Sequence, residues 1–145
     1  MSSRAVDPQD AVIDRILART RTIAVVGASR DPNKSAHGVP AMLQREGYRI
    51  IPVNPHADEL FGERVHRSLD TIDDEVDLVD VFRPAADAVD VVRAAVERGV
   101  GAVWLQQDIV SPEARAIAEA AGVDYVEDRC IAVEVRLRGA RPAAR

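Results

Sequence analysis

A short stretch of residues that could hold an anionic group follows an apolar run early in the chain: Gly27-Ala28-Ser29-Arg30, with Lys34 four residues later. Gly27 lets the backbone turn sharply and approach a phosphate, because glycine has no side chain and accepts left-handed dihedral angles. The amides after it and the N-terminus of the next helix would supply donors and a positive dipole. Ser29 adds a hydroxyl, and Arg30 and Lys34 add positive charge. The alternative is that the loop only closes a strand-to-helix turn and its basic residues face solvent.

The spacing of this loop differs from the glycine pattern of dinucleotide-binding proteins. Gly27 is not followed by the second and third glycines of G-x-G-x-x-G, and the next strand ends in Asn54-Pro55 where an acidic residue would bind the ribose of NAD. Asp58 and Glu59 come a few residues later and stay open as substitutes for that acid. These departures weaken an NAD interpretation without removing it.

Further polar residues follow the later apolar runs. Phe82-Arg83 follows one run and Gln106 another, where its amide is a candidate ligand contact. Cys130 is the only thiol; it could exchange disulfides with a bound thiol, although a lone cysteine is more often a small buried hydrophobic residue. The histidines, which lack metal-ligand spacing, are His37, His56 and His66. They are interpreted as polar surface residues, the first two with an auxiliary phosphate contact as the alternative.

The elements that must position these residues alternate between strands and helices. Apolar runs predict strands at 22–26, 48–53, 76–82, 100–105 and 123–126, with a minor strand at 64–66. Helical spacing predicts helices at 7–19, from between 35 and 40 to 47, at 85–98 and at 111–122. Asp7 and Ser111, each followed by proline, are predicted N-caps. Asp77 and Asp80 are three apart, so one of them is expected near a strand end or a wet edge.

This alternation predicts an α/β fold of the Rossmann-like, doubly wound kind: a mostly parallel sheet of about five strands with helices on both faces. We expect a single domain over 1–145, with its core at 22–134 and a frayed basic tail at 136–145. Ligands bind such sheets at the carboxyl ends of the strands, where the strand order reverses. With the usual order 3-2-1-4-5, Gly27-Ala28-Ser29 should face Phe82-Arg83.

Composition limits the class of protein. The chain has 145 residues, 47% of them hydrophobic and 30% charged, which is typical of a soluble globular domain. No segment approaches the roughly 20 apolar residues of a membrane span. A net charge of −5 disfavours nucleic acid as a partner, because backbone binding needs a dense basic surface. The first residues lack the apolar core of a secretory signal, so the cytoplasm is the expected compartment.

Several fragments taken together resemble a known family. In chain order they are VVGAS, DPNKS, EGYRIIPVNP, the G-x-x-V of Gly62 to Val65, VDLVDVFRP, GAVWLQ and DRCI. They are similar to the small stand-alone CoA-binding proteins, whose domain resembles the N-terminal CoA-binding domain of the succinyl-CoA synthetase α subunit. The resemblance runs from about Thr22 to Glu134. One departure is Asp108, which stands where the family commonly has a glycine.

The resemblance implies that CoA lies across the ends of the first, second and fourth strands. Gly27 to Arg30 would hold its diphosphate, and Asn54-Pro55 would lie by the ribose phosphate or the adenine. Phe82-Arg83 would complete the pocket. Counted singly, the residues implied are Gly27, Ala28, Ser29, Arg30, Lys34, Ser35, Asn54, Pro55, Phe82 and Arg83.

The leading hypothesis is a module that binds CoA or an acyl-CoA as a carrier, sensor or regulatory partner, without turnover of its own. No catalytic constellation supports an enzyme, although the hypothesis leaves that question open. The alternative is an NAD(P)-binding oxidoreductase or redox sensor on the same fold. A third, weaker hypothesis is an acyl-CoA ligase subunit that acts with a partner chain; self-association also stays open.

Overall fold

The computed structural model describes residues 7–144. Residues 1–6 and 145, which the sequence assigns to the predicted domain and its tail, lie outside the described range. In chain order the elements are α1 (Pro8–Arg19), β1 (Thr22–Val26), α2 (Ser35–Arg45), β2 (Arg49–Val53), β3 (Glu59–Leu60), β4 (Glu63–Arg64), the 3-10 helix η1 (Leu69–Thr71), β5 (Leu78–Val81), α3 (Ala85–Arg98), β6 (Ala102–Leu105), α4 (Pro112–Ala120), β7 (Asp124–Val126) and α5 (Ile131–Arg138).

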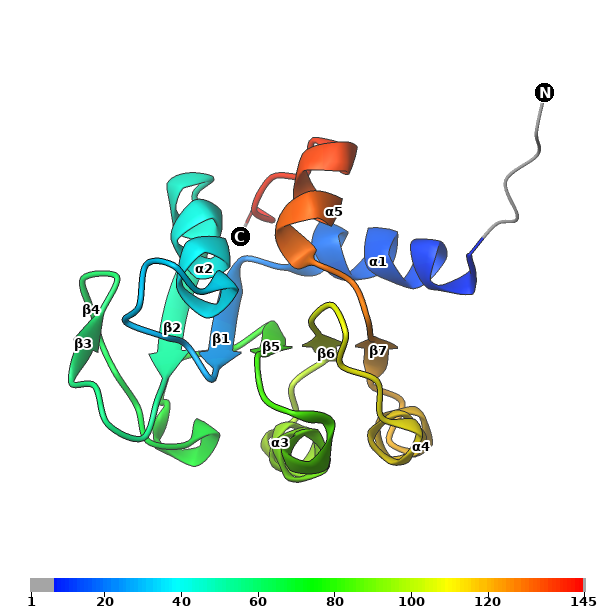
Figure 1. The fold of residues 1–145 in the computed structure, drawn as a ribbon. Coiled ribbons are helices and arrows are strands. Elements are labelled where there is room, and N and C mark those ends of the chain that lie inside the picture. Colours follow the sequence, from blue (N-terminus) through cyan, green and yellow to red (C-terminus); the bar gives the residue numbers. More distant parts are fainter. Residues whose placement is uncertain (1–6, 145) are drawn as a thin grey trace.

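A parallel sheet of five strands forms the centre of the described chain, in the order β2-β1-β5-β6-β7 (Figure 1). β1 pairs with β2 on one side and with β5 on the other, so that Val26 stands opposite both Val53 and Val81. The strand order therefore reverses between β1 and β5. The predicted Rossmann-like α/β fold is confirmed.

Helices cover both faces of this sheet. α1, α2 and α5 lie on one face, while α3 and α4 lie on the other (Figure 1). Neighbouring residues of β1 point to opposite layers: Ile23 and Val25 belong to the core under α1, α2 and α5, whereas Ala24 belongs to the core under α3 and α4. Coverage on both faces explains why the strands are continuous apolar runs instead of alternating ones.

The predicted minor strand at 64–66 differs from what the structure contains. β3 and β4 pair with each other as a short antiparallel hairpin, and only His66 joins the main sheet, through a single parallel bridge to Val53. Arg64 pairs with Glu59, and the Val65 amide donates to the Asp58 carbonyl at 3.0 Å, so the backbone bonds of these two residues go to the hairpin and not to the main sheet. The strands predicted at 48–53, 22–26, 76–82 and 100–105 lie side by side in the predicted order, as β2, β1, β5 and β6.

The two predicted N-caps are confirmed. A side-chain oxygen of Asp7 accepts from the Gln9 amide at 2.9 Å, and Ser111 Oγ accepts from the Ala114 amide at 3.1 Å. Of the two aspartates near β5, Asp77 lies just before the strand, where it accepts the amide of Arg21 at 3.0 Å. This strand-end position is the one expected for one of the pair.

The predicted frayed tail is wrong for its first residues. Residues 136–138 belong to α5, which ends at Gly139 in a left-handed conformation. Beyond the helix, the Ala143 amide donates to the Thr20 carbonyl at 2.8 Å, which ties the chain back to the end of α1. The sequence signal was missed because α5 has apolar residues on several sides and no amphipathic period. No helix within residues 7–144 is long and apolar enough to cross a membrane.

Candidate ligand site at the strand ends

Gly27 is the point where the loops after β1 and β5 meet. Its φ of +90° lies in the left-handed region, and a Cβ added there would lie 2.7 Å from the Phe82 carbonyl oxygen and 3.1 Å from Arg83 Cδ. Only glycine fits both the conformation and the space. The predicted juxtaposition of Gly27 with Phe82-Arg83 is therefore present. We call the loop of residues 27–34, the first turn of α2 and Phe82-Arg83 the strand-end site.

The β1–α2 loop is held by hydrogen bonds to its own residues and to α2. The Ser29 amide donates to the Ala36 carbonyl at 3.0 Å, and Ser29 Oγ accepts from the Asp31 amide at 3.0 Å. The Lys34 amide donates to the Asp31 carbonyl at 3.0 Å. The Ser29 hydroxyl, predicted as a ligand donor, therefore serves the turn as an acceptor and keeps its own proton available.

Several donors in this loop are left without a protein acceptor. In the described part of the chain, no acceptor pairs with the backbone amides of Ala28, Arg30, Ser35 and Ala36. The last two are at the N-terminus of α2, where the aligned peptide dipoles leave partial positive charge. Arg30 and Lys34 are both exposed beside them. The loop thus offers amides, a helix terminus and two cations to one anionic group.

Asn54 lies beside this loop, but its side chain is occupied by protein groups. Nδ2 donates to the Ala28 carbonyl at 2.7 Å, while Oδ1 accepts from the His56 amide at 2.7 Å and the Ala57 amide at 2.8 Å. Asn54 thereby joins the end of β2 to the loop after β1. Pro55, the other half of the predicted pair, is exposed.

Arg83 and Phe82 form the opposite wall. The Arg83 guanidinium pairs with Asp87 one turn into α3, at 2.8 Å, and both side chains are about half exposed (46% and 50%). Such an exposed pair contributes little to stability, so the guanidinium can turn to a ligand at low cost. Phe82 is half-buried and packs on the core under α1, α2 and α5.

Gln106 lies beside the end of β5, where its backbone amide donates to the Val81 carbonyl at 3.2 Å, but its side chain is not open to a ligand. It is buried, with its Nε2 donating to Asp80 Oδ1 and its Oε1 accepting from the Ile131 amide at 3.4 Å. Both ends of the amide are therefore used inside the protein. The strand-end rule found the residue, but it could not show that α5 begins directly over it.

Asp80 is a buried carboxyl that the sequence did not single out as functional. It lies in the middle of β5 between Val25 and Trp104 of the neighbouring strands and has no exposed surface. Burial raises its pKa to about 8, although the hydrogen bond from Gln106 acts in the opposite direction. Oδ2 has no hydrogen-bond partner within the described residues. Asp80 is therefore a protonated acid at neutral pH.

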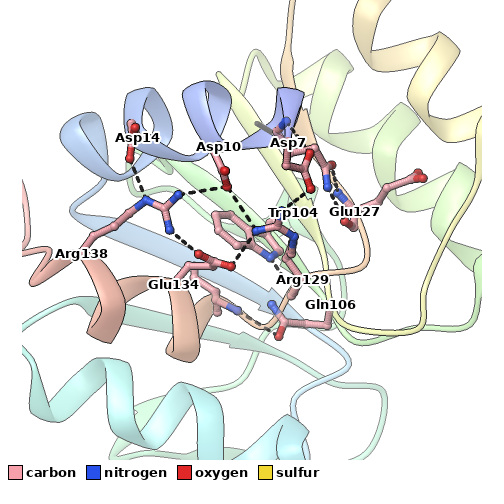
Figure 2. A network of polar contacts seen from close by, with 11 residues as sticks. Asp7, Asp10, Asp14, Trp104, Gln106, Glu127, Arg129, Glu134 and Arg138 are labelled. Carbon is pink, nitrogen blue, oxygen red and sulfur yellow. Dashed lines mark hydrogen bonds and ion pairs between the residues drawn. The ribbon is translucent and has the colours of Figure 1, made fainter. Parts of the chain in front are cut away.

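An ion network holds the segment that follows β7 (Figure 2). Arg129 pairs with Asp7, and with Glu134 at 2.8 Å, and Arg138 bridges Glu134 to Asp14. The network joins the N-terminal half of α1 to α5. Glu134 lies at its centre and is almost fully buried, with 8% of its side chain exposed.

Side chains of β6 and of α1 fix the backbone of the same segment. Trp104 Nε1 donates to the Arg129 carbonyl at 2.9 Å (Figure 2). The Gln9 side chain pairs with both backbone groups of Glu127, at 3.0 and 2.8 Å. Cys130 lies within this segment at the start of α5 and is half-buried. We call residues 127–131, together with the side chains that hold them, the support segment.

The backbone conformation of Asp108 shows why the family commonly has a glycine at this position. Its φ is +69°, in the left-handed region that glycine favours and that aspartate tolerates better than most residues. Its amide donates to Asp128 Oδ1 at 2.7 Å. A glycine at this position of the family therefore fits a backbone requirement. No group of three or more metal-ligating side chains is present among residues 7–144.

Comparisons with known proteins find two kinds of relative, and the first is similar to this chain in length. The chain is 39% identical over 127 residues to the uncharacterized protein YneT of Bacillus subtilis, covering 88% of this chain and 94% of that protein. The solved structure of a hypothetical protein from Pyrococcus horikoshii OT3 superposes with a TM-score of 0.87 at 33% identity, covering 94% of this chain and 97% of the other.

A second kind of relative is much longer. The ADP-forming acetate–CoA ligase II of Archaeoglobus fulgidus is 34% identical over 92 residues, which cover 61% of this chain and only 14% of the ligase. The model of the CoA binding domain family matches residues 21–136, most of the chain. This match and the likeness to YneT confirm the family resemblance found in the sequence: the chain belongs to the CoA binding domain family.

Proposed function

We propose that this protein binds CoA or an acyl-CoA at the strand-end site and does so as a binding module without turnover of its own. The observation that carries the proposal is the set of unpartnered amides in the β1–α2 loop, which lies beside Arg30 and Lys34 where the strand order reverses. A diphosphate needs this combination of backbone donors, helix dipole and positive charge.

The family resemblance implies a place for each part of the ligand, and the geometry of the strand-end site supports it. Gly27 to Arg30 would hold the diphosphate, flanked by Lys34 and Ser35. Pro55, exposed at the end of β2, would lie by the ribose phosphate or the adenine, while Asn54 holds the loop in place. Arg83 would close over the site from the β5 side, exchanging its surface pair with Asp87 for a phosphate.

The chain matches a small part of the ligase and most of two smaller relatives. The chain corresponds to 14% of the Archaeoglobus enzyme, while it covers nearly all of YneT and of the Pyrococcus protein. We propose the role of a carrier, sensor or regulatory module, with CoA bound for recognition and not consumed.

The test compares four nucleotides on the purified protein: CoA, acetyl-CoA, NAD and NADP. A ligand present at 100 times its Kd stabilises the folded state by about 2.7 kcal/mol, which raises the melting temperature by several degrees. We expect this shift with CoA or acetyl-CoA, and native mass spectrometry should show one ligand per chain. Stabilisation by NAD or NADP alone would overturn the proposal. Consumption of acetyl-CoA in the presence of ADP and phosphate would overturn the non-catalytic part only.

A further inference from the structure

His37 lies in the first turn of α2 with its ring turned back to the β1–α2 loop. Nδ1 is 2.7 Å from the Ser29 carbonyl oxygen. A carbonyl oxygen can only accept, so this contact requires the proton to be on Nδ1. The imidazole also packs against the ring of Phe61, with ring centroids 5.0 Å apart and planes tilted by 46°. The half-buried ring is thus fixed from two directions.

Holding the Ser29 carbonyl also sets the direction of the next amide. A trans peptide unit is planar, and its N–H points opposite to its C=O. The Arg30 N–H is therefore directed away from the His37 ring. It has no acceptor within residues 7–144, whereas the Ser29 N–H is already used by the Ala36 carbonyl.

We infer that His37 is a positioning residue that holds the Arg30 amide ready to donate to an anionic group of the ligand. This inference rests on the proposed function, because it assigns a role within the same site. It differs from a direct histidine–phosphate contact: the imidazole acts through the Ser29–Arg30 peptide and touches no ligand atom.

The tip of the β3–β4 hairpin supplies Phe61, the residue that packs against His37. Phe61 and Gly62 at its tip have φ of +58° and +73°, and a left-handed conformation is uncommon for phenylalanine. The Phe61 carbonyl is held by Gln44 Nε2 of α2 at 2.7 Å, which keeps the tip in this conformation. The hairpin thereby presses the phenyl ring against His37 and limits its rotation.

The test uses three substitutions that separate the two ring nitrogens. The amide nitrogen of asparagine occupies the place of imidazole Nδ1, whereas that of glutamine occupies the place of Nε2. We expect His37→Asn to keep its affinity for CoA within about twofold, and His37→Gln and His37→Ala to lose about tenfold, as for one hydrogen bond to a charged group. Isothermal titration calorimetry with CoA measures all three.

Several outcomes decide the matter. Full affinity in all three variants, or retention by glutamine with loss by asparagine, would overturn the inference, since the second pattern marks direct contact through Nε2. Failure of the unchanged protein to bind CoA would overturn the proposed function instead. If His37→Ala does not fold, the asparagine and glutamine pair decides alone. The matched control is His66→Asn. The ring of His66 pairs with Thr71 outside the strand-end site, so this variant should bind CoA normally.

A second readout needs no ligand. Nitrogen chemical shifts of the imidazole distinguish its tautomers, and we expect His37 to carry its proton on Nδ1 in the ligand-free protein at pH 8. A proton on Nε2 would remove the bond to Ser29 and with it the inference.

Discussion

Where β1 ends, the amides of Arg30, Ser35 and Ala36 have no acceptor in the described chain, whereas where β6 and β7 end, Gln106 and Arg129 are paired with protein groups on every side. Both regions lie at the carboxyl ends of parallel strands, the edge at which such folds bind ligands. The difference is in how the donors are used: those of the first region have no protein acceptor and are open to the proposed ligand, whereas those of the second hold α5 and α1 against the sheet.

This contrast teaches that a polar residue after a parallel strand is only a candidate for ligand contact. Its hydrogen-bonding groups must also be left over once the fold is built. Changes in the strand-end site should therefore alter affinity with little change in stability. Changes in the support segment should alter stability with little change in affinity.

Gly27 is where this separation should break down. In Gly27→Ala the new Cβ would press on the Phe82 carbonyl at 2.7 Å, and alanine would have to adopt a φ of +90°. Left-handed strain and the clash with backbone together predict a loss of about 4 kcal/mol of stability. CoA affinity should fall with it, because the loop and the Phe82-Arg83 wall move apart. Urea denaturation and calorimetry measure the two effects.

Gly38 gives a matched control for that experiment. It lies in α2, its φ is not positive, and a Cβ there would have no heavy atom within 4 Å. Gly38→Ala should leave stability unchanged or raise it by up to about 1 kcal/mol. Equal destabilisation by both substitutions would contradict the steric role of Gly27.

Asp80, which bonds to Gln106 beneath the support segment, makes the stability of the protein depend on pH. An unfolded aspartate ionises near pH 4, whereas the folded protein keeps Asp80 protonated up to its pKa of about 8. Between these values folding takes up a proton, so this group lowers stability as the pH rises and its effect levels off above pH 8. From pH 5 to 7 the cost is about 2–3 kcal/mol.

Asp80→Asn removes that cost. The difference in unfolding free energy between the variant and the unchanged protein should shift in favour of the variant as the pH rises from 5 to 7. Asp90→Asn, which removes an exposed carboxyl from α3, serves as the control. Parallel pH profiles for Asp80→Asn and the unchanged protein would contradict a protonated Asp80. CoA affinity at pH 7 should be the same in both.

Arg129 tests the ionic part of the support segment. Arg129→Met keeps most of the apolar stem but removes the pairs to Asp7 and Glu134 and leaves Glu134 with Arg138 alone. We expect a loss of about 2 kcal/mol of stability, because the network is only partly exposed. Arg15→Met, which breaks an exposed pair with Asp124, should cost less than about 1 kcal/mol. A large loss of CoA affinity in Arg129→Met would contradict the prediction that the support segment affects stability and not affinity.

The sequence predicted the sheet and the meeting of the β1 and β5 loops at the candidate site because both follow from local signals. Apolar runs bounded by turn residues located the main strands, and Gly27 marked the turn at which β1 and β5 loops meet. The sequence did not predict α5, because its apolar residues have no helical period and because it is held by carboxylates of α1, far away in the sequence.

The roles within the site depend on contacts that spacing does not encode. Gln106 and Asn54 both follow strands and were both expected near the ligand, yet Gln106 is covered by the start of α5 and Asn54 binds the Ala28 carbonyl. The sequence allows His37 to be a surface residue or a phosphate contact, whereas its bond to the Ser29 carbonyl supports a third role, as a positioning residue. In each case a partner distant in sequence decides which donors are used up.

The smallest expected effect concerns the two cations of the strand-end site. Arg30 and Lys34 are exposed beside the unpartnered amides and have no ion pair within residues 7–144. Replacing either with glutamine should therefore leave the melting temperature unchanged. CoA affinity should fall by about tenfold for each, or about 1.4 kcal/mol, because a charge-assisted contact to phosphate is lost.

Salt makes this last prediction specific. Interactions between exposed charges are screened at physiological ionic strength, so the affinity of the unchanged protein should fall as salt is raised, and more steeply than that of Arg30→Gln or Lys34→Gln. Arg19 is the last residue of α1 and lies near the start of β1, at the amino ends of the strands. Arg19→Gln removes this exposed cation and should change neither the affinity for CoA nor its salt dependence. If Arg19→Gln weakened CoA as much as Arg30→Gln, net charge alone would explain the effect, and the strand-end site would lose its claim to the diphosphate.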